Sequence, residues 1–534
     1  MFIAQVRDLW SHNNRQSLAM IMAASMTSIL LLALVTLLLF ILLRGSAFFW
    51  PTQVKTIEYQ IDSHDQIHTV LAKVQQIEGQ SSSALTQGKH LAETHLEVST
   101  IDSLGIQSHS IILNSENIIK QHVESRVAEM QMDDGQYFFF YLDALQSPSK
   151  TFLSVDGLPE LLQQVSDLEK QISLIRDGHL SSIHRQIAQL DRSGVALDAP
   201  ARVKLEQQFF HFQQAINRLQ QSLSQYLLFV SDAEGNKTSI MLSDVSQVHF
   251  PNQLTTLGKL GLSVTKIFAF LLESPKQANT AGGIFPALFG TILMVLLMTV
   301  IVTPFGVLAA IYLSEYAPAN ALTSAVRIGV SNMAGVPSIV YGVFGLGFFV
   351  YGIGGGIDEL FYSDHLPSPT FGTPGLFWAS LTMALLTLPV VVVATEEGLK
   401  RVPRGIRNSS YALGATKIET IWYTVLPIAS PGIMTGVILA IARAAGEVAP
   451  LMLVGAVKFA PTLPVDSDFP FLHLDRQFMH LGVLIYDGAF HSQTSIQGSS
   501  MMFAACLLLL LCVFGLNLIA INLRSRLRKR YSQD

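Results

Sequence analysis

Residues 285–314 read FPALFGTILMVLLMTVIVTPFGVLAAIYLS, thirty positions without a charged side chain. About 20 apolar residues are enough for an α-helix to cross the hydrocarbon core of a bilayer. This stretch therefore predicts a transmembrane helix. Half of the 534 residues are hydrophobic and 14% are charged, against about 25% in an ordinary soluble domain. The composition excludes a disordered chain and argues against a soluble cytoplasmic enzyme.

Five more apolar runs lie on both sides of this stretch. The first of them, 18–43, is too long for the apolar core of a signal peptide, and the Arg44-Gly45-Ser46 that follows is a poor cleavage site. We therefore expect this run to remain in the protein as a helix. The fold class predicted is an all-α polytopic membrane protein with six transmembrane helices. The five runs are 18–43, 328–357, 375–395, 428–457 and 501–523, the fourth of which contains two charges.

Basic residues indicate which side of the membrane each loop occupies. Lys and Arg gather in the tail 1–17, in the loop 396–427 and in the tail 524–534. The charged residues of 358–364, in contrast, are all acidic. Cytoplasmic loops carry the excess of Lys and Arg. We therefore expect both termini and the 396–427 loop to be cytoplasmic, with the segments 44–281 and 458–497 outside.

Residues 44–281 form a large polar insert between the first two helices. From Arg44 to Ile284, 18 basic and 25 acidic residues give a net charge of −7. Apolar residues recur at heptad spacing in two arms, with a four-residue stutter at His179, and predict a coiled-coil hairpin over 159–230. We expect a mainly helical insert, with a small mixed strand and helix unit at 52–145. The amphipathic stretch 257–272 fits either a membrane-surface helix or a buried linker helix.

No enzyme motif occurs in the sequence. It has no P-loop, no GxSxG and no HExxH. Cys506 and Cys512, the two cysteines, lie in an apolar run, and the histidines of the insert lack metal-ligand spacing. The net charge of −5 argues against nucleic-acid binding. We expect a protein that is not an enzyme and has no metal or cofactor.

The loop 396–427 has the pattern of two short helices joined at a glycine. Ser409 or Ser410 is a suitable cap for a following helix, and Gly414 allows a sharp turn or a close approach. Leu426-Pro427 is expected to restart the chain into the fifth membrane helix. Such helices, lying parallel to the membrane, would form a knob. The alternative is an ordinary basic loop that only fixes topology.

This loop resembles the EAA loop of bacterial ABC importer permeases. Gly414, Thr424, Leu426 and Pro427 match the spacing of that motif. Its leading Glu-Ala-Ala aligns with Asn408-Ser409-Ser410, so the acidic residue is missing, and with it the basis for one particular salt bridge to the ATPase. The docking element itself remains.

Four more stretches carry a resemblance to phosphate ABC importer permeases of the PstA type. The likeness is clear over about 280–457 and looser over 498–522. Most such permeases lack so large an insert, so the resemblance implies no function for 44–281. The stretches are GGIFPALFGT (282–291), AAIYLSEYAP (309–318), GVPSIVYG (335–342) and ARAAGEVAPL (442–451).

The resemblance implies a type-I importer of the bacterial inner membrane, with 282–523 as the permease core and 396–427 as its coupling loop. It implies a second permease of the PstC type, two ATPase subunits and a periplasmic phosphate-binding protein as partners, besides membrane lipid. The partners would hydrolyse ATP and shift the permease between inward-open and outward-open states. Two other functions stay open: a permease for another oxyanion, or a membrane sensor or envelope regulator with a periplasmic coiled coil.

Arg443 and Glu447 are the candidate substrate path. They are four apart in the 428–457 run, so on a helix they share a face and can pair. Charges inside a membrane are costly, so we expect them to face an interior cavity. The guanidinium fork suits phosphate oxygens, and the resemblance implies the same role. The alternative is an ion pair that only locks the helix against its neighbours.

Overall fold

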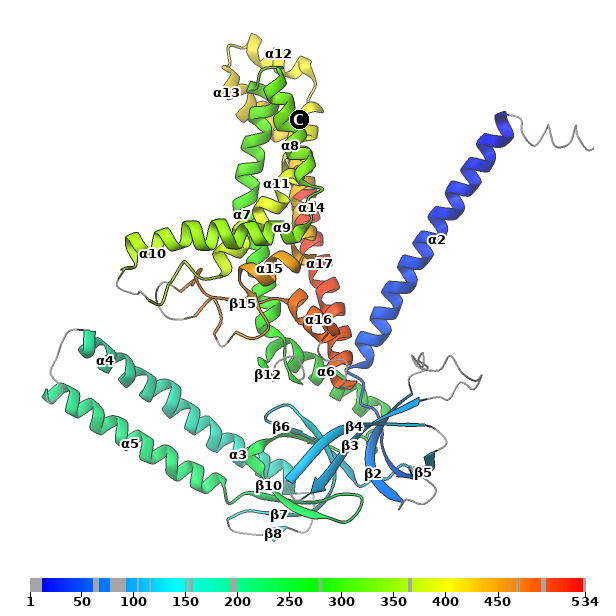
Figure 1. Ribbon diagram of the computed structural model, residues 1–534, viewed down its shortest axis with the longest axis vertical. Helices are drawn as coiled ribbons and strands as arrows, with labels where there is room; N and C mark the ends of the chain where they lie inside the picture. Colours follow the sequence, from blue (N-terminus) through cyan, green and yellow to red (C-terminus); the bar gives the residue numbers. More distant parts are fainter. Residues whose placement is uncertain are drawn as a thin grey trace, which may run out of the picture.

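The computed structural model describes most of the chain, and all structural statements concern this part (Figure 1). The described residues are 12–60, 67–76, 93–102, 105–114, 117–148, 151–152, 157–192, 199–277, 281–363, 367–460, 462–466, 469, 471–490 and 496–531.

Six helices in the described residues are long and apolar enough to cross a membrane. The expectation of a polytopic membrane protein is thus confirmed. α7, α11, α14 and α17 run together in Figure 1, whereas α2 stands apart and contacts α17. The six are α2 (His12–Ala47), α7 (Phe285–Ile311) with the π-helical turn η5 (Tyr312–Tyr316), the segment α9–η6–α10, α11 (Leu376–Lys400), α14 with its preceding turns, and α17 (Ile496–Tyr531).

α11 is the central helix of the bundle. It packs against α7 on one side and against α14 on another, and Met383, Leu386 and Val391 are buried in the main core cluster. Small residues let α11 and α14 come close: a Cβ added to Gly432 would lie 2.7 Å from the Cα of Gly398. Close backbone approach of this kind is typical of helix packing in membranes.

The third predicted span, 328–357, is not one helix. It is broken between α8 (Ala321–Met333) and the segment formed by α9 (Ser338–Phe344), η6 (Gly345–Gly354) and α10 (Gly355–Phe361), which runs across the view in Figure 1. The break falls at Gly335-Val336-Pro337. Proline lacks the N–H that a helix needs, and it disfavours helical geometry in the residue before it.

The fifth predicted span, 428–457, also has different bounds. Its helix already begins at α13 (Lys417–Glu419), continues through η8 (Thr420–Val425), and ends with α14 (Leu426–Gly446). The expected restart at Leu426-Pro427 is therefore wrong. After a short break, α15 (Ala449–Val454) follows. Beyond it, β14 (Ala456–Val457) pairs with β15 (Phe478–Met479), and α16 (Leu481–Phe490) precedes α17.

The insert contains two β-sheets, so the all-α fold class and the mainly helical insert were wrong predictions. One sheet has the order β4-β3-β2-β1-β5, and the other has β10-β9-β7-β6-β11 with β8 beside β7. Residues 52–145, expected to be a small mixed strand and helix unit, contain β1 to β6 and nearly all of β7. The strands are β1 (Val54–Tyr59), β2 (His68–Gln76), β3 (Glu93–Asp102), β4 (Gly105–Asn114), β5 (Ile118–His122), β6 (Val127–Met132), β7 (Tyr137–Gln146), β8 (Thr151–Phe152), β9 (Leu227–Ser231), β10 (Lys237–Met241) and β11 (Val245–His249).

A helical hairpin projects from the second sheet (Figure 1). One arm consists of α3 (Leu158–Ser173), η3 (Leu174–Leu180) and α4 (Ser181–Arg192), and the other is α5 (Pro200–Leu223). Buried seam residues include Leu161, Val165 and Ile216. The stutter at His179 coincides with the π-helical η3, where the imidazole stacks on Phe212 with 4.7 Å between ring centroids.

The predicted hairpin, 159–230, is too long at its second end. Helix α5 ends at Leu223, and Val230 lies in β9, because the same apolar residues pair with β7 and β10 as a strand. Most of the expected turn between the arms, 193–198, falls outside the described residues.

One amphipathic helix, α6 (Thr256–Leu272), connects the insert to the membrane helices. Thr255 caps it by accepting a hydrogen bond from the Gly258 N–H. The short pair β12 (Pro275–Gln277) and β13 (Ala281–Gly282) then leads into α7. Figure 1 shows α6 between the insert and the helix bundle.

Candidate functional site

Arg443 and Glu447 come together as predicted, but at a helix end. The Arg443 Nε lies 3.5 Å from Glu447 Oε1, and the side chains are 31% and 25% exposed. Arg443 is in the last turn of α14, and Glu447 has extended backbone angles, φ −84° and ψ 132°. The pair therefore does not lie in the middle of one continuous helix. A helix C-terminus favours a nearby positive charge.

The helix break beside this pair is packed against α9. A Cβ added to Gly342 of α9 would lie 2.7 Å from the Cα of Pro450, just after the break. Tyr341 donates a hydrogen bond of 2.7 Å to the Met333 carbonyl and thereby ties α9 to α8. Among the described residues, Arg443 Nε has no hydrogen-bond partner. Nε therefore meets Glu447 only as an ion pair at 3.5 Å.

The predicted coupling loop consists of two helical segments joined at Gly414. α12 (Arg404–Ala412) ends there with φ +86° at the glycine. The Gly414 N–H donates to the Tyr411 carbonyl, and the Ala415 N–H donates to the Ser410 carbonyl. This pair of bonds is a Schellman motif, in which the residue with positive φ is usually glycine. The expected glycine joint is present.

The expected capping serines have other partners. Ser409 Oγ donates to the Gly405 carbonyl within α12, and Ser410 Oγ bonds Thr420 Oγ1 at 2.9 Å. The next helix is instead capped by Thr416, whose side chain and that of Glu419 form a capping box. Asn408 is exposed on α12, and Leu426 and Pro427 are half-buried within the continuous helix.

Exposed apolar side chains occur on both helical segments that meet at Gly414. Leu413 is 89% exposed and Tyr423 is 76% exposed, although both lie in a polar-looking loop. Large exposed apolar groups gathered in one place mark an interaction surface. We call this set the loop patch; it comprises Tyr411, Leu413, Ile418, Trp422 and Tyr423. Sequence reasoning missed it because the apolar residues are dispersed among charges.

Glu315, at the end of α7, holds both arms of the loop. Its carboxylate receives a hydrogen bond of 2.6 Å from Arg407 Nη1. The Glu315 carbonyl accepts a bond from Lys417, whose Nζ also lies 4.4 Å from the centroid of the Tyr316 ring. Arg407 further donates to the Leu399 carbonyl. Glu315 was missed because its partners are about a hundred positions away in the sequence.

Comparisons with known proteins match the membrane part of the chain. The family described as "Binding-protein-dependent transport system inner membrane component" matches residues 302–529. A phosphate transport system permease protein PstA of Mycobacterium leprae is 32% identical over 55% of this chain and 88% of its own length. Another, from Yersinia pestis, is 33% identical over 49% of this chain and 78% of its own length.

A solved chain of the MetNI methionine ABC transporter, in inward-facing conformation, is 17% identical over 45% of this chain and 94% of that chain. Its TM-score of 0.33 is too low to bear on the fold. The family rests instead on the two relatives at 32% and 33% identity, which align over most of their own lengths. With six apolar helices to cross the inner membrane, the chain belongs to the family of PstA-type binding-protein-dependent transport permeases.

Proposed function

We propose that this chain is a transmembrane subunit of an ATP-driven importer of inorganic phosphate. The observation that carries the proposal is its identity to proteins named as phosphate permeases. The match to the transport family, over residues 302–529, includes the Arg443–Glu447 pair. The chain itself does not hydrolyse ATP in this proposal, since its sequence has no P-loop.

Arg443 is the anion-binding residue of the proposed path. The planar fork of its partly exposed guanidinium suits the oxygens of phosphate, which it would hold by charge-assisted hydrogen bonds. Glu447 balances part of the positive charge at 3.5 Å, so that the anion is held weakly and passes. The helix break beside the pair supplies a place where the backbone can change direction between two transport states.

The loop patch is the proposed docking surface for one of two ATPase subunits. Its exposed side chains lie on both helical segments of a joint that Glu315 ties to the end of α7. Movement of a docked ATPase would thereby reach α7 and α14 directly. The other partners in this proposal are a second permease of the PstC type and a periplasmic phosphate-binding protein. We also propose cytoplasmic termini and a periplasmic insert.

Uptake of radioactive phosphate tests this function. A strain lacking the gene should take up phosphate slowly at low external concentration, and the chain expressed with its own partners should restore uptake. Sulfate and molybdate are the matched comparisons. Restored uptake of either of these, with phosphate uptake unchanged, would replace phosphate by another oxyanion. Restoration of none of the three would favour an envelope regulator.

A further inference from the structure

Helix α6 turns a wide apolar face away from the rest of the protein. The exposed residues recur at spacings of three and four, so they share one side of the helix. The most exposed is Leu257 at 79%, and Phe268 is 58% exposed. The lipid-side stripe, as we define it, comprises Leu257, Leu260, Val264, Ile267, Phe268 and Leu272.

The opposite face of α6 is fixed by aromatic packing. Phe270 is buried, and its ring centroid lies 5.4 Å from that of Phe48 and 5.3 Å from that of Phe49. Both of these residues directly follow α2. The packing holds the helix to the end of a membrane span and prevents it from turning the lipid-side stripe inward.

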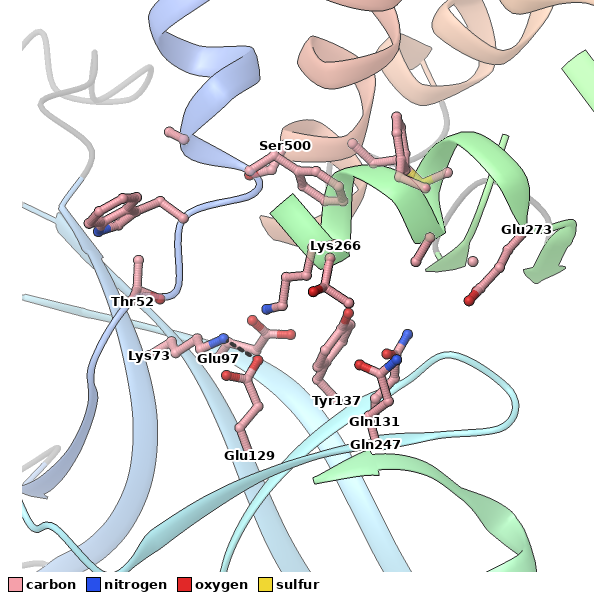
Figure 2. Close-up of a pocket in the computed structure, with 18 residues that line it drawn as sticks. Thr52, Lys73, Glu97, Glu129, Gln131, Tyr137, Gln247, Lys266, Glu273 and Ser500 are labelled. Carbon is pink, nitrogen blue, oxygen red and sulfur yellow. Dashed lines mark hydrogen bonds and ion pairs between the residues drawn. The ribbon is translucent and has the colours of Figure 1, made fainter. Parts of the chain in front are cut away.

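A charged cluster holds the same face of α6 to the insert. Figure 2 shows Lys266 pointing from α6 toward the sheets, into a cavity of about 160 Å³ that Glu129, Lys73 and Tyr137 also line. Lys73 Nζ lies 2.6 Å from Glu129 Oε1, and Lys266 Nζ lies 5.8 Å from the centroid of the Tyr137 ring. Glu129 is buried, with its second oxygen unpaired, so a nearby ammonium group is favourable.

The lining of the same cavity shows where α6 lies relative to the ends of the membrane spans. Its wall includes Ala47, the last residue of α2, and Ser500 and Met501 near the start of α17. Helix α6 therefore lies at the end of the bundle where α2 ends and α17 begins. Trp50, 43% exposed, lies at this level, where tryptophan is enriched at membrane–water interfaces.

We propose that α6 lies in the interfacial zone of the bilayer leaflet on the insert's side. The lipid-side stripe then faces lipid, and the Lys266 side chain points into the insert. Lipid is the occupant because α6 is packed against the end of α2, a span whose apolar side chains are themselves exposed along its length. An amphipathic helix of this kind lies along the membrane surface. The insert is thus seated on the membrane and not only tethered to it by α2 and α7.

Spin labelling of the full-length chain in phospholipid vesicles tests this placement. Cys506 and Cys512, the two native cysteines, are replaced by serine, and one cysteine is introduced and labelled. Val264→Cys samples the lipid-side stripe. The matched control is Phe210→Cys, on the exposed side of α5, another apolar position of the insert. Collision rates with oxygen, which concentrates in lipid, and with a water-soluble nickel chelate are measured.

The label at position 264 should show a several-fold higher ratio of oxygen to nickel collisions than the label at 210. Equal ratios would place α6 in water and overturn the proposal. Low collision rates with both reagents at 264 would mean that protein covers the stripe, which also overturns it. Uptake of phosphate is not needed for either reading, so the result is independent of the proposed function.

Discussion

At the scale of single residues, the charge of Arg443 is only partly balanced. Its Nε lies 3.5 Å from Glu447, which leaves most of the guanidinium fork free of that carboxylate. Arg443→Gln keeps a hydrogen-bond donor but removes the charge. A hydrogen bond to a charged group is worth about 1.5–3 kcal/mol, so we expect phosphate uptake to fall about 10- to 100-fold.

The control for this prediction is Glu447→Gln, which leaves the positive charge unbalanced. It should tighten phosphate binding and slow its release, so the KM for uptake falls together with the maximal rate. Normal transport by Arg443→Gln would make the arginine structural at most. Failure of that variant to assemble would support an ion pair that locks the helix.

Glu97 predicts a pH-dependent stability of the insert. Burial raises its pKa to about 7, although Lys73 opposes this, and the nearby Glu129 adds to it. Between pH 4.5, the usual pKa of a glutamate, and about pH 7 the folded state binds more protons than the unfolded state. The free energy of unfolding therefore decreases as pH rises through this window.

Glu97→Gln mimics the protonated form and removes this dependence. At about pH 4.5 the variant and the parent should be equally stable, and at about pH 8 the variant should be more stable by roughly 3 kcal/mol. Thermal unfolding in detergent at both pH values measures this difference in stability.

Glu129→Gln is the control of opposite sign. Burial raises the pKa of Glu129, but Lys73 and Lys266 outweigh burial and lower it, so this substitution should destabilise at pH 8. Equal responses of the two variants would contradict the assignment.

At the scale of elements, Gly414 decides how α12 meets the next helix. A Cβ there would find nothing within 4 Å, so the fold has room for a side chain and the cost is the backbone at φ +86°. For an ordinary residue that cost is about 1–2 kcal/mol. Gly414→Leu should leave membrane insertion intact and abolish ATP-driven uptake, because the side chain projects into the surface proposed to fit the ATPase.

Asparagine separates the two roles of this glycine, since it accepts positive φ better than other residues. If the ATPase needs a bare surface, Gly414→Asn loses uptake and copurification of the ATPase as well. Normal uptake by Gly414→Asn would reduce the glycine to a turn residue. The readouts are uptake and the amount of ATPase that copurifies with the chain.

The elements that local pattern determines were predictable from the sequence. Each apolar run contains a membrane helix because hydrophobicity and length alone select it. Helix breaks were missed because the spans were predicted from charge and length alone: the signal for the first break is Pro337 in Gly335-Val336-Pro337. The second break follows Gly446, where α14 ends three residues before the next helix. The sheets of the insert were not predicted because short strands with one exposed face give a weak pattern of alternating apolar and polar residues.

The contacts of the candidate site and of the insert also differ in whether a local sequence pattern reveals them. The Arg443–Glu447 pair is four residues apart and was found from spacing. The Glu315–Arg407 contact joins residues 92 positions apart, and Lys73–Glu129 joins two different sheets. Such pairs depend on how whole elements pack, and no local signal carries that information.

At the scale of the whole molecule, the polar parts separate to opposite ends of the helix bundle. Figure 1 shows α12 and α13 at one end and the insert at the other, with α2 running from the α12 end toward the insert. The basic loop therefore lies at the end of the bundle where α2 begins and α17 ends, and the acidic insert lies at the other. This is the distribution that the positive-inside rule predicts for a chain with cytoplasmic termini.

Alkaline phosphatase fusions test this orientation, because the enzyme is active only after export. Fusions after residues 150 and 470 should be active, since both positions fall in the sequence segments expected outside, 44–281 and 458–497. A fusion after 415, beside the Gly414 joint, should be inactive. A fluorescent reporter that matures only in the cytoplasm should give the inverse pattern and controls for expression. Phosphatase activity at 415 would reverse the membrane orientation, and with it the proposed ATPase docking at the loop patch.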